Sequence, residues 1–215
     1  MQQKAAVDFD RLMATPVVTV PYPFLIVPQF IAPASRHAIA QDFPQVGGAG
    51  SYPLPSLDFG PAFAALIGQL CGAQMTKIVE QKFQIDLSGR PVMATVRGRC
   101  EARDGHIHTD SKTKLITLLL YMNDHPDAGR GRLRILRSPT DLNDVAAEVP
   151  SDEATLLIFR NGPTAWHGFE PINGPRRVIQ VNWVTNRAVV RREQSRHRVS
   201  AFIKRIVGRN HAAAH

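Results

Sequence analysis

Three side chains that could bind a metal stand at alternate positions of one short stretch, GHIHTDS (105–111): His106, His108 and Asp110. In an extended segment alternate side chains point to the same face, so all three would lie together, just ahead of the apolar run LITLLLYMN. Imidazole and carboxylate groups are common ligands of transition metals. The stretch therefore indicates either a metal site or a solvated strand end whose histidines are incidental.

A histidine further along the chain, His167 in TAWHGFEP, is the candidate that would complete a metal site. Two histidines and one carboxylate on one face of a metal form the facial triad of non-haem Fe(II) oxygenases, which leaves positions open for a chelating co-substrate and O₂. We therefore predict a site made of His108, Asp110 and His167. Taken alone, His167 also fits an ordinary histidine that is bonded to a backbone carbonyl.

An arginine pair follows His167 at the start of the β-like run RRVIQVNW, and Arg177 stands ten residues beyond the histidine. An arginine inside a β-barrel is costly unless it is paired. A dicarboxylate co-substrate would supply the partner, because the guanidinium can hold a carboxylate through two parallel hydrogen bonds. Adjacent strand residues face opposite ways, so only one of Arg176 and Arg177 can point inward.

The elements that must position these residues fall into two parts of the chain, a mostly helical one and a β-rich one. Before residue 91, TPVVTVPYPFLIVPQFI predicts an entering edge strand, PASRHAIAQDF a short helix, and FGPAFAALIGQLCG with AQMTKIVEQKF two helices that break at Gly72. From Pro91 onward, short β-like runs alternate with Gly/Pro turns, which favours an antiparallel sandwich or barrel. The tail REQSRHRVSAFIKRIVG predicts a basic amphipathic helix.

Residues 91–183 resemble the Fe(II)/2-oxoglutarate-dependent dioxygenases, and most of all the prolyl-hydroxylase branch. The similar segments are HTDSKTKLITLLLYMN, GRLRIL and ATLLIFRNGPTAWHGFEPINGPRRVIQVNW. They share the order of His-x-Asp, Tyr-x-Asn, distal histidine, basic residue and tryptophan. The spacing from His167 and the six-residue step to Trp183 select Arg177 as the basic residue of that pattern.

The resemblance implies a fold, cofactors and an activity. The expected fold class is mainly β (α+β), a double-stranded β-helix or jelly-roll with supporting N-terminal helices and a basic C-terminal helix. The expected domain is single: supporting elements in 1–90, the jelly-roll core in 91–190, and a helix and tail in 191–215. The implied cofactors are Fe(II), 2-oxoglutarate and O₂, and the implied activity is hydroxylation of a substrate C–H bond. Tyr121 and Thr117 would then join Arg177 around 2-oxoglutarate.

Other readings of the same residues stay open. His106-x-His108 is also similar to the His-x-His of cupins, although no glutamate follows within the next few residues, and we assign His106 no iron-binding role. A non-catalytic barrel that senses 2-oxoglutarate or iron, or acts as a scaffold, is the alternative from another functional class. Arg97, Arg99 and Arg103 suggest an anionic substrate, while solvated charges on an edge strand explain them equally well.

The overall composition is that of a folded globular chain: 215 residues, 44% hydrophobic and 20% charged, with a formal net charge of +8. The basic balance favours anionic partners, but no aromatic platform interleaved with basic residues accompanies it, so nucleic acid is not an expected partner. Two cysteines without paired-motif spacing indicate no disulfide framework. The N-terminus lacks the pattern of a secretory signal, and we expect a cytoplasmic protein with no membrane span.

Overall fold

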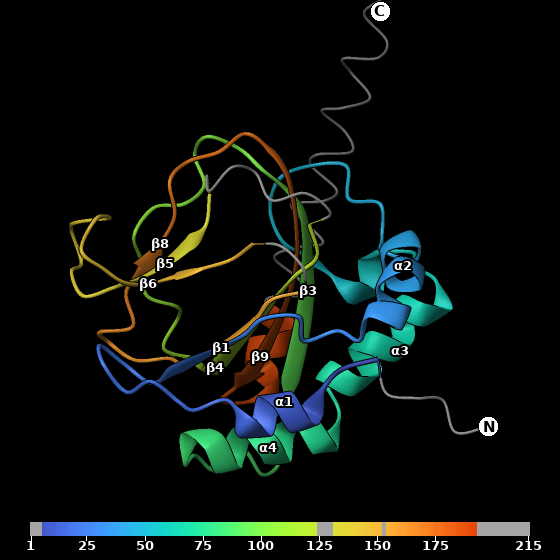
Figure 1. Ribbon diagram of the computed structural model, residues 1–215, viewed down its shortest axis with the longest axis horizontal. Coiled ribbons are helices and arrows are strands. Elements are labelled where there is room, and N and C mark those ends of the chain that lie inside the picture. Colours follow the sequence, from blue (N-terminus) through green and yellow to red (C-terminus); the bar gives the residue numbers. More distant parts are fainter. Residues whose placement is uncertain (1–5, 124–130, 152–153, 193–215) are drawn as a thin grey trace, which may run out of the picture.

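Two antiparallel sheets stand against each other in the computed structural model, which describes residues 6–123, 131–151 and 154–192 (Figure 1). The six-stranded major sheet has the order β1-β7-β4-β9-β3-β2, and the three-stranded minor sheet has the order β6-β5-β8. The major strands are β1 (Phe24–Val27), β7 (Leu156–Arg160), β4 (Lys114–Tyr121), β9 (Gly174–Val184), β3 (Val92–Cys100) and β2 (Tyr52–Pro53). The minor strands are β6 (Val145–Val149), β5 (Leu133–Leu136) and β8 (His167–Gly168). This arrangement confirms the predicted jelly-roll-like, mainly β fold.

The strands of the major sheet are amphipathic in a way that separates the outside of the sheet from its inside. In β4, Ile116, Leu118 and Leu120 belong to one core cluster, while Leu119 and Tyr121 belong to a second one. Successive side chains of a strand point to opposite faces, so the two clusters lie on opposite sides of the sheet. The first cluster is the larger and lies under the helices.

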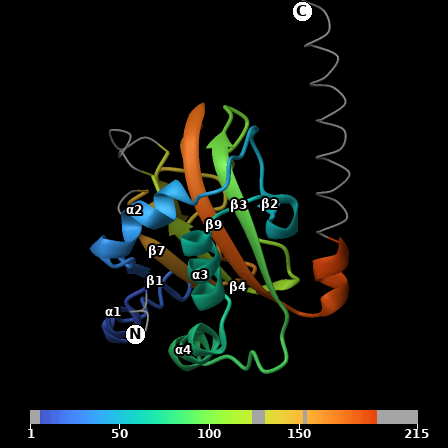
Figure 2. The ribbon, with the colours of Figure 1, turned by 90° about the vertical axis from the view of Figure 1, so that its right-hand side faces the viewer.

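Four α-helices cover the outer face of the major sheet (Figure 2). They are α1 (Phe9–Ala14), α2 (Pro33–Gln41), α3 (Pro61–Leu70) and α4 (Ala73–Phe83), and a short 3-10 turn, η1 (Leu54–Ser56), follows β2. Their buried apolar residues pack with the outward side chains of β4 and β9 in one cluster. The short helix, the two helices broken at Gly72 and the entering edge strand all lie where the sequence predicted them.

The break between α3 and α4 has a steric cause at Gly72. A Cβ atom at this position would lie 2.8 Å from the carbonyl oxygen of Gly68, so the sharp turn requires glycine. The 23-residue stretch Pro61–Phe83 is the one helical stretch in the described part of the chain that is long and apolar enough to cross a membrane. Because it divides into two helices and buries residues of both against the sheet, it belongs to the core of the fold.

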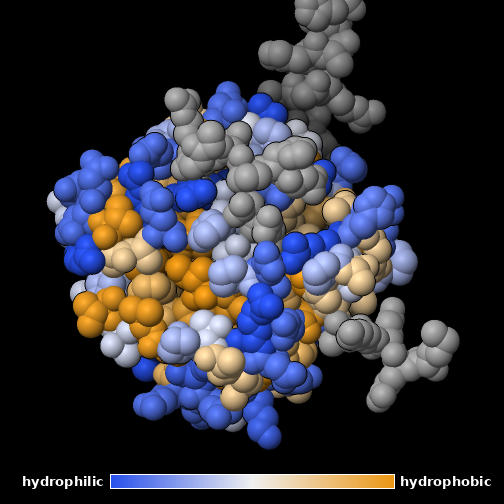
Figure 3. All heavy atoms as spheres, in the orientation of Figure 1, coloured by the Kyte–Doolittle hydropathy of each residue, from blue (hydrophilic) through white to orange (hydrophobic). Residues whose placement is uncertain are grey.

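The surface and the C-terminal segment lie outside the two sheets and their covering helices. On the face shown in Figure 3, polar residues dominate the periphery and apolar residues show between them. Residues 187–192 are helical, so the chain becomes helical five residues before Arg192, where the predicted C-terminal helix was expected to begin. The rest of that predicted helix lies outside the described residues.

Candidate metal centre and its cavity

The two histidines of the predicted triad are held together by backbone pairing. His108 and His167 form an isolated antiparallel bridge in which each backbone N–H donates to the other residue's carbonyl at 3.0 Å. Their rings are 4.4 Å apart between centroids. Asp110 lies two residues beyond His108, and the nearest ligand atoms of all three residues lie within 4.8 Å of one another. The structure therefore brings together the three residues that the sequence singled out.

Both imidazoles are oriented by the backbone carbonyl group two residues earlier in the chain. The Nδ1 atom of His108 lies 2.8 Å from the carbonyl oxygen of His106, and that of His167 lies 2.9 Å from the carbonyl of Ala165. A carbonyl can only accept, so each Nδ1 carries the proton and each Nε2 presents a lone pair. Metal-ligating histidines are commonly oriented in this way.

The carboxylate of Asp110 is held by two partners. Its Oδ1 accepts from the Lys114 ammonium at 2.7 Å, and its Oδ2 accepts from the Thr117 hydroxyl at 2.6 Å. The Thr117 oxygen in turn accepts from the side-chain amides of Asn161 at 2.9 Å and Asn182 at 2.8 Å. Because two donors occupy its acceptor sites, the Thr117 hydroxyl must donate toward Asp110.

The environment favours the protonation states that a metal site requires. Burial, and next the neighbouring His108, lower the pKa of His167 to about 4, against the opposing effect of Asp110. Burial alone would raise the pKa of Asp110, but the charges of Lys114 and His167 and the two hydrogen bonds outweigh it and hold that pKa below its usual value. At neutral pH the site thus offers a neutral imidazole and an ionised carboxylate. This donor set of two imidazoles and one carboxylate fits Fe(II).

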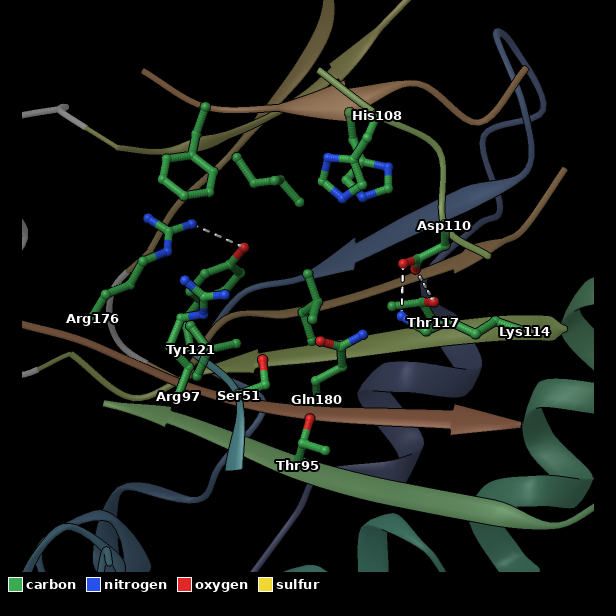
Figure 4. Close-up of a pocket in the computed structure, with 15 residues that line it drawn as sticks. Ser51, Thr95, Arg97, His108, Asp110, Lys114, Thr117, Tyr121, Arg176 and Gln180 are labelled. Carbon is green, nitrogen blue, oxygen red and sulfur yellow. Dashed lines mark hydrogen bonds and ion pairs between the residues drawn. The ribbon is translucent and has the colours of Figure 1, made fainter. Parts of the chain in front are cut away.

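The triad opens into a cavity of about 410 Å³ between the two sheets (Figure 4). Its walls come from the inward faces of β3, β4 and β9, from the minor sheet, and from the segment before β2. Besides the triad, Lys114 and Thr117, the residues that line the cavity are Ser51, Thr95, Arg97, Leu119, Tyr121, Leu133, Phe169, Arg176, Val178 and Gln180. A cavity of this size lies within the usual range for small-molecule sites.

The prediction that Arg177 enters the barrel is wrong, and Arg176 takes that place. The Arg176 side chain is 4% exposed and lines the cavity. Arg177 lies on the helix side instead, with its guanidinium 5.5 Å from the centroid of the Phe43 ring. Trp183 explains the error: it also faces the helices, where its indole N–H donates to Thr76 at 3.1 Å. Residues six positions apart in a strand lie on the same face. Arg177, six residues before Trp183, therefore shares its helix-facing side, and the spacing to Trp183 led to the wrong arginine.

Arg176 is buried without an acidic partner. Its guanidinium donates to the carbonyl of Gly131, lies 3.5 Å from the Tyr121 hydroxyl, and stacks 4.2 Å from the centroid of the Phe169 ring. No carboxylate in the described part of the chain forms an ion pair with it. A buried cation of this kind calls for an anionic ligand.

The other predicted residues occupy different parts of the same cavity. Tyr121 lies beside Arg176, as its predicted role requires. Thr117 lines the cavity too, but its hydroxyl is engaged by Asp110 and not by the Arg176 end. The imidazole of His106 is exposed and is not grouped with the triad.

Several residues of the site escaped the sequence analysis. Lys114 reaches Asp110 because a register irregularity of β4 between Lys114 and Ile116 changes the alternation of faces. The fold also brings three amide side chains to the site, and no local pattern in the sequence predicts this. They are Asn161, Gln180 and Asn182. The spacing of four residues between Asp110 and Lys114 was the one signal present in the sequence.

The comparisons with known proteins agree with this geometry. Residues 99–185 match the sequence model of the 2OG-Fe(II) oxygenase superfamily. A search among curated proteins gives no match.

Solved structures resemble the fold at low sequence identity. A prolyl-4-hydroxylase of Pseudomonas putida is 15% identical with a TM-score of 0.54, over 85% of this chain and 92% of that one. A prolyl 4-hydroxylase of Phytophthora capsici is 12% identical with a TM-score of 0.52, over 75% and 58%. HygX of Streptomyces hygroscopicus, solved with nickel and 2-oxoglutarate, is 12% identical with a TM-score of 0.51, over 76% and 83%.

The segment that matches the superfamily contains the His108–Asp110–His167 triad, the buried Arg176 and strands of both sheets. Over residues 99–185 the chain thus resembles the 2OG-Fe(II) oxygenase superfamily, and the donor set of its triad fits the iron that this superfamily is named for.

Proposed function

We propose that the protein is an Fe(II)- and 2-oxoglutarate-dependent oxygenase that hydroxylates an unactivated C–H bond. One observation carries this proposal: three side chains that could bind a metal line the same cavity as a buried arginine that forms no ion pair among the described residues. A metal bound by the triad would chelate the keto-acid end of 2-oxoglutarate. Arg176, in the same cavity, would pair with the second carboxylate. The prolyl 4-hydroxylases among the structural relatives support hydroxylation as the outcome.

In this proposal His108, Asp110 and His167 hold the iron. Lys114 and Thr117 fix the Asp110 carboxylate, and the carbonyls of residues 106 and 165 fix the imidazoles. When bound, Fe(II) and 2-oxoglutarate would supply the oxidising chemistry together with O₂, of which one oxygen atom would enter succinate as CO₂ leaves and the other would enter the substrate. The protein's share is to leave coordination positions open and to keep the site's ligands rigid.

Arg176 takes the role that the sequence analysis gave to Arg177. Its guanidinium would bind the far carboxylate of 2-oxoglutarate, assisted by the Tyr121 hydroxyl beside it. The cation would then have the ionic partner that the described part of the chain does not supply. The stacking of Arg176 on Phe169 restricts the guanidinium to this part of the cavity.

The test is to measure succinate formation from 2-oxoglutarate with added Fe(II), together with Fe(II) binding in the absence of oxygen. His108→Ala, Asp110→Ala and His167→Ala should each abolish turnover and weaken iron binding, because each removes a ligand. His106→Ala is the matched control: it removes a nearby imidazole but keeps the backbone carbonyl that orients His108.

The control should behave like the unaltered protein. Loss of iron binding in His106→Ala together with tolerance of Asp110→Ala would indicate a three-histidine site and contradict the proposal. Iron and 2-oxoglutarate binding without any turnover, across a broad substrate panel, would favour a non-catalytic sensor.

A further inference from the structure

One wall of the cavity carries polar side chains that the iron and 2-oxoglutarate roles do not use. This polar wall consists of Thr95 and Arg97 of β3, Gln180 of β9, and Ser51, which directly precedes β2. Thr95 and Gln180 are direct partners across the β3–β9 pair, and β2 pairs with β3 at Thr95 and Val96. The wall is therefore one continuous patch on the inward face of the sheet.

The polar wall has hydrogen-bonding capacity that the protein leaves unfilled. Thr95 is 5% exposed, yet neither its hydroxyl nor that of Ser51 has a hydrogen-bond partner among the described residues. Gln180 donates through Nε2 to Asn182 at 3.1 Å, which leaves its Oε1 as an acceptor. Figure 4 shows the hydroxyls of Ser51 and Thr95 pointing into the cavity. Because both side chains line the cavity, a ligand bound there can supply the hydrogen-bond partners of these hydroxyls.

The charges around the cavity select the kind of ligand. Three cations line it, Arg97, Lys114 and Arg176, against one lining carboxylate, Asp110. Asp104 pairs with Arg97 at 3.0 Å, and Asp110 pairs with Lys114 at 2.7 Å. The two charges of Fe(II) and the two of 2-oxoglutarate cancel. These described groups, with Fe(II) and 2-oxoglutarate bound, therefore sum to one positive charge over the whole cavity, which favours an anionic group over a cationic one. At the polar wall itself the cation is Arg97, which a substrate would share with Asp104.

We propose that the polar wall binds the substrate, and that this substrate is a small carboxylic acid of the size of a free amino acid. Arg97 and the Thr95 and Ser51 hydroxyls take its carboxylate, and the Oε1 of Gln180 accepts from an N–H or O–H group next to it. The inference rests on the proposed function, because it places the substrate in the cavity that also holds 2-oxoglutarate. The cavity's 410 Å³, shared with 2-oxoglutarate, leaves room for a molecule of the size of one amino acid.

The test compares three sets of probes on the protein loaded with Fe(II) and 2-oxoglutarate without oxygen. The probes are the free L-amino acids, their carboxamides, and the same residues blocked as N-acetyl methylamides. Binding is measured by equilibrium dialysis, and succinate release is then measured in air. We expect at least one free acid to bind and to stimulate succinate release, with its carboxamide about tenfold or more weaker, because the carboxamide lacks the charge.

The outcomes separate this inference from the proposed function. If 2-oxoglutarate itself fails to bind, the proposed function fails. If 2-oxoglutarate binds but only blocked residues or peptides stimulate turnover, the substrate is peptidyl and the inference is overturned. It is also overturned if no free acid binds, or if the carboxamide binds as well as the acid.

Two variants assign the site to the polar wall. Arg97→Met should weaken binding of the stimulating acid about 10- to 100-fold, and Thr95→Val, which is close to isosteric, about 2- to 10-fold. In each variant the loss of affinity for the acid should exceed the loss for 2-oxoglutarate, a ratio that general destabilisation would not produce. Thr76→Val is the matched control, because Thr76 lies on α4 and outside the cavity. Equal losses for both ligands in Arg97→Met and Thr95→Val would contradict the assignment.

Discussion

The two faces of strand β9 are both interior but differ in the residues they carry. On the helix side, Ile179, Val181 and Trp183 are fully buried and join the large apolar cluster. On the cavity side, Arg176 and Asn182 are equally enclosed but polar. Both faces are interior, so burial alone does not explain the contrast.

The contrast shows which interior serves stability and which serves binding. A buried cation without an acid partner, or a buried hydroxyl without a hydrogen bond, costs stability. Such groups persist where function requires them, and proteins commonly trade stability for function at these places. The helix-facing side of the sheet then has to supply the stability that the cavity side does not.

The largest effect that tests this contrast is expected from Trp183. Trp183→Ala removes a fully buried indole from the helix-facing cluster and should lower the free energy of unfolding by about 3–5 kcal/mol. Urea denaturation of the ligand-free protein measures it. Val178→Ala, on the cavity side, should cost less than Val181→Ala on the helix side, because Val178 already borders open space. A larger cost at Val178 would mean that the two faces contribute alike.

The next effect concerns the arginine pair. Arg176→Leu should weaken 2-oxoglutarate binding by a factor of roughly 30 to several thousand, as expected from about 2–5 kcal/mol for a buried guanidinium–carboxylate contact. The unfolding free energy of the ligand-free protein should stay the same or rise, because an unpaired buried cation disappears. Titration with 2-oxoglutarate and urea denaturation measure the two quantities.

Arg177→Leu is the matched control for this pair. It should leave 2-oxoglutarate affinity nearly unchanged, since its guanidinium lies over Phe43 on the opposite face. A greater loss in Arg177→Leu than in Arg176→Leu would show that the assigned faces of β9 are reversed.

A smaller effect is expected at Thr117, which connects the strand interior to the metal site. Thr117→Val removes the hydroxyl that donates to Asp110 and should weaken Fe(II) binding about 10- to 100-fold, the usual range for groups that orient a ligand. Competition with a chelating dye measures it. Thr113→Val should change iron affinity little, because among the described residues the Thr113 hydroxyl has its hydrogen bond with Ser111. Comparable losses in both variants would assign the effect to the loop as a whole.

The sequence predicted most elements and the pair His108 and Asp110 because these depend on local patterns, whereas the choice of His167 rested on the family resemblance. The prolines around Phe24–Val27, the glycine at residue 72 and the alternate histidine and aspartate are all visible without knowledge of the fold. The choice between Arg176 and Arg177 was not, because alternation states that two neighbours face opposite ways but not which way each faces. Thr95 and Gln180 become neighbours only through the pairing of β3 with β9, 85 residues apart in their numbering.

Because backbone carbonyl groups orient the two imidazoles, the site can tolerate sequence divergence. The acceptors belong to residues 106 and 165, and a peptide carbonyl is present whatever side chain those positions carry. Substitution there leaves the tautomers of His108 and His167 unchanged, as long as the strand ends keep their path. A lineage can therefore exchange most of the surrounding residues and retain the centre, in keeping with folds that still superimpose at 12–15% identity.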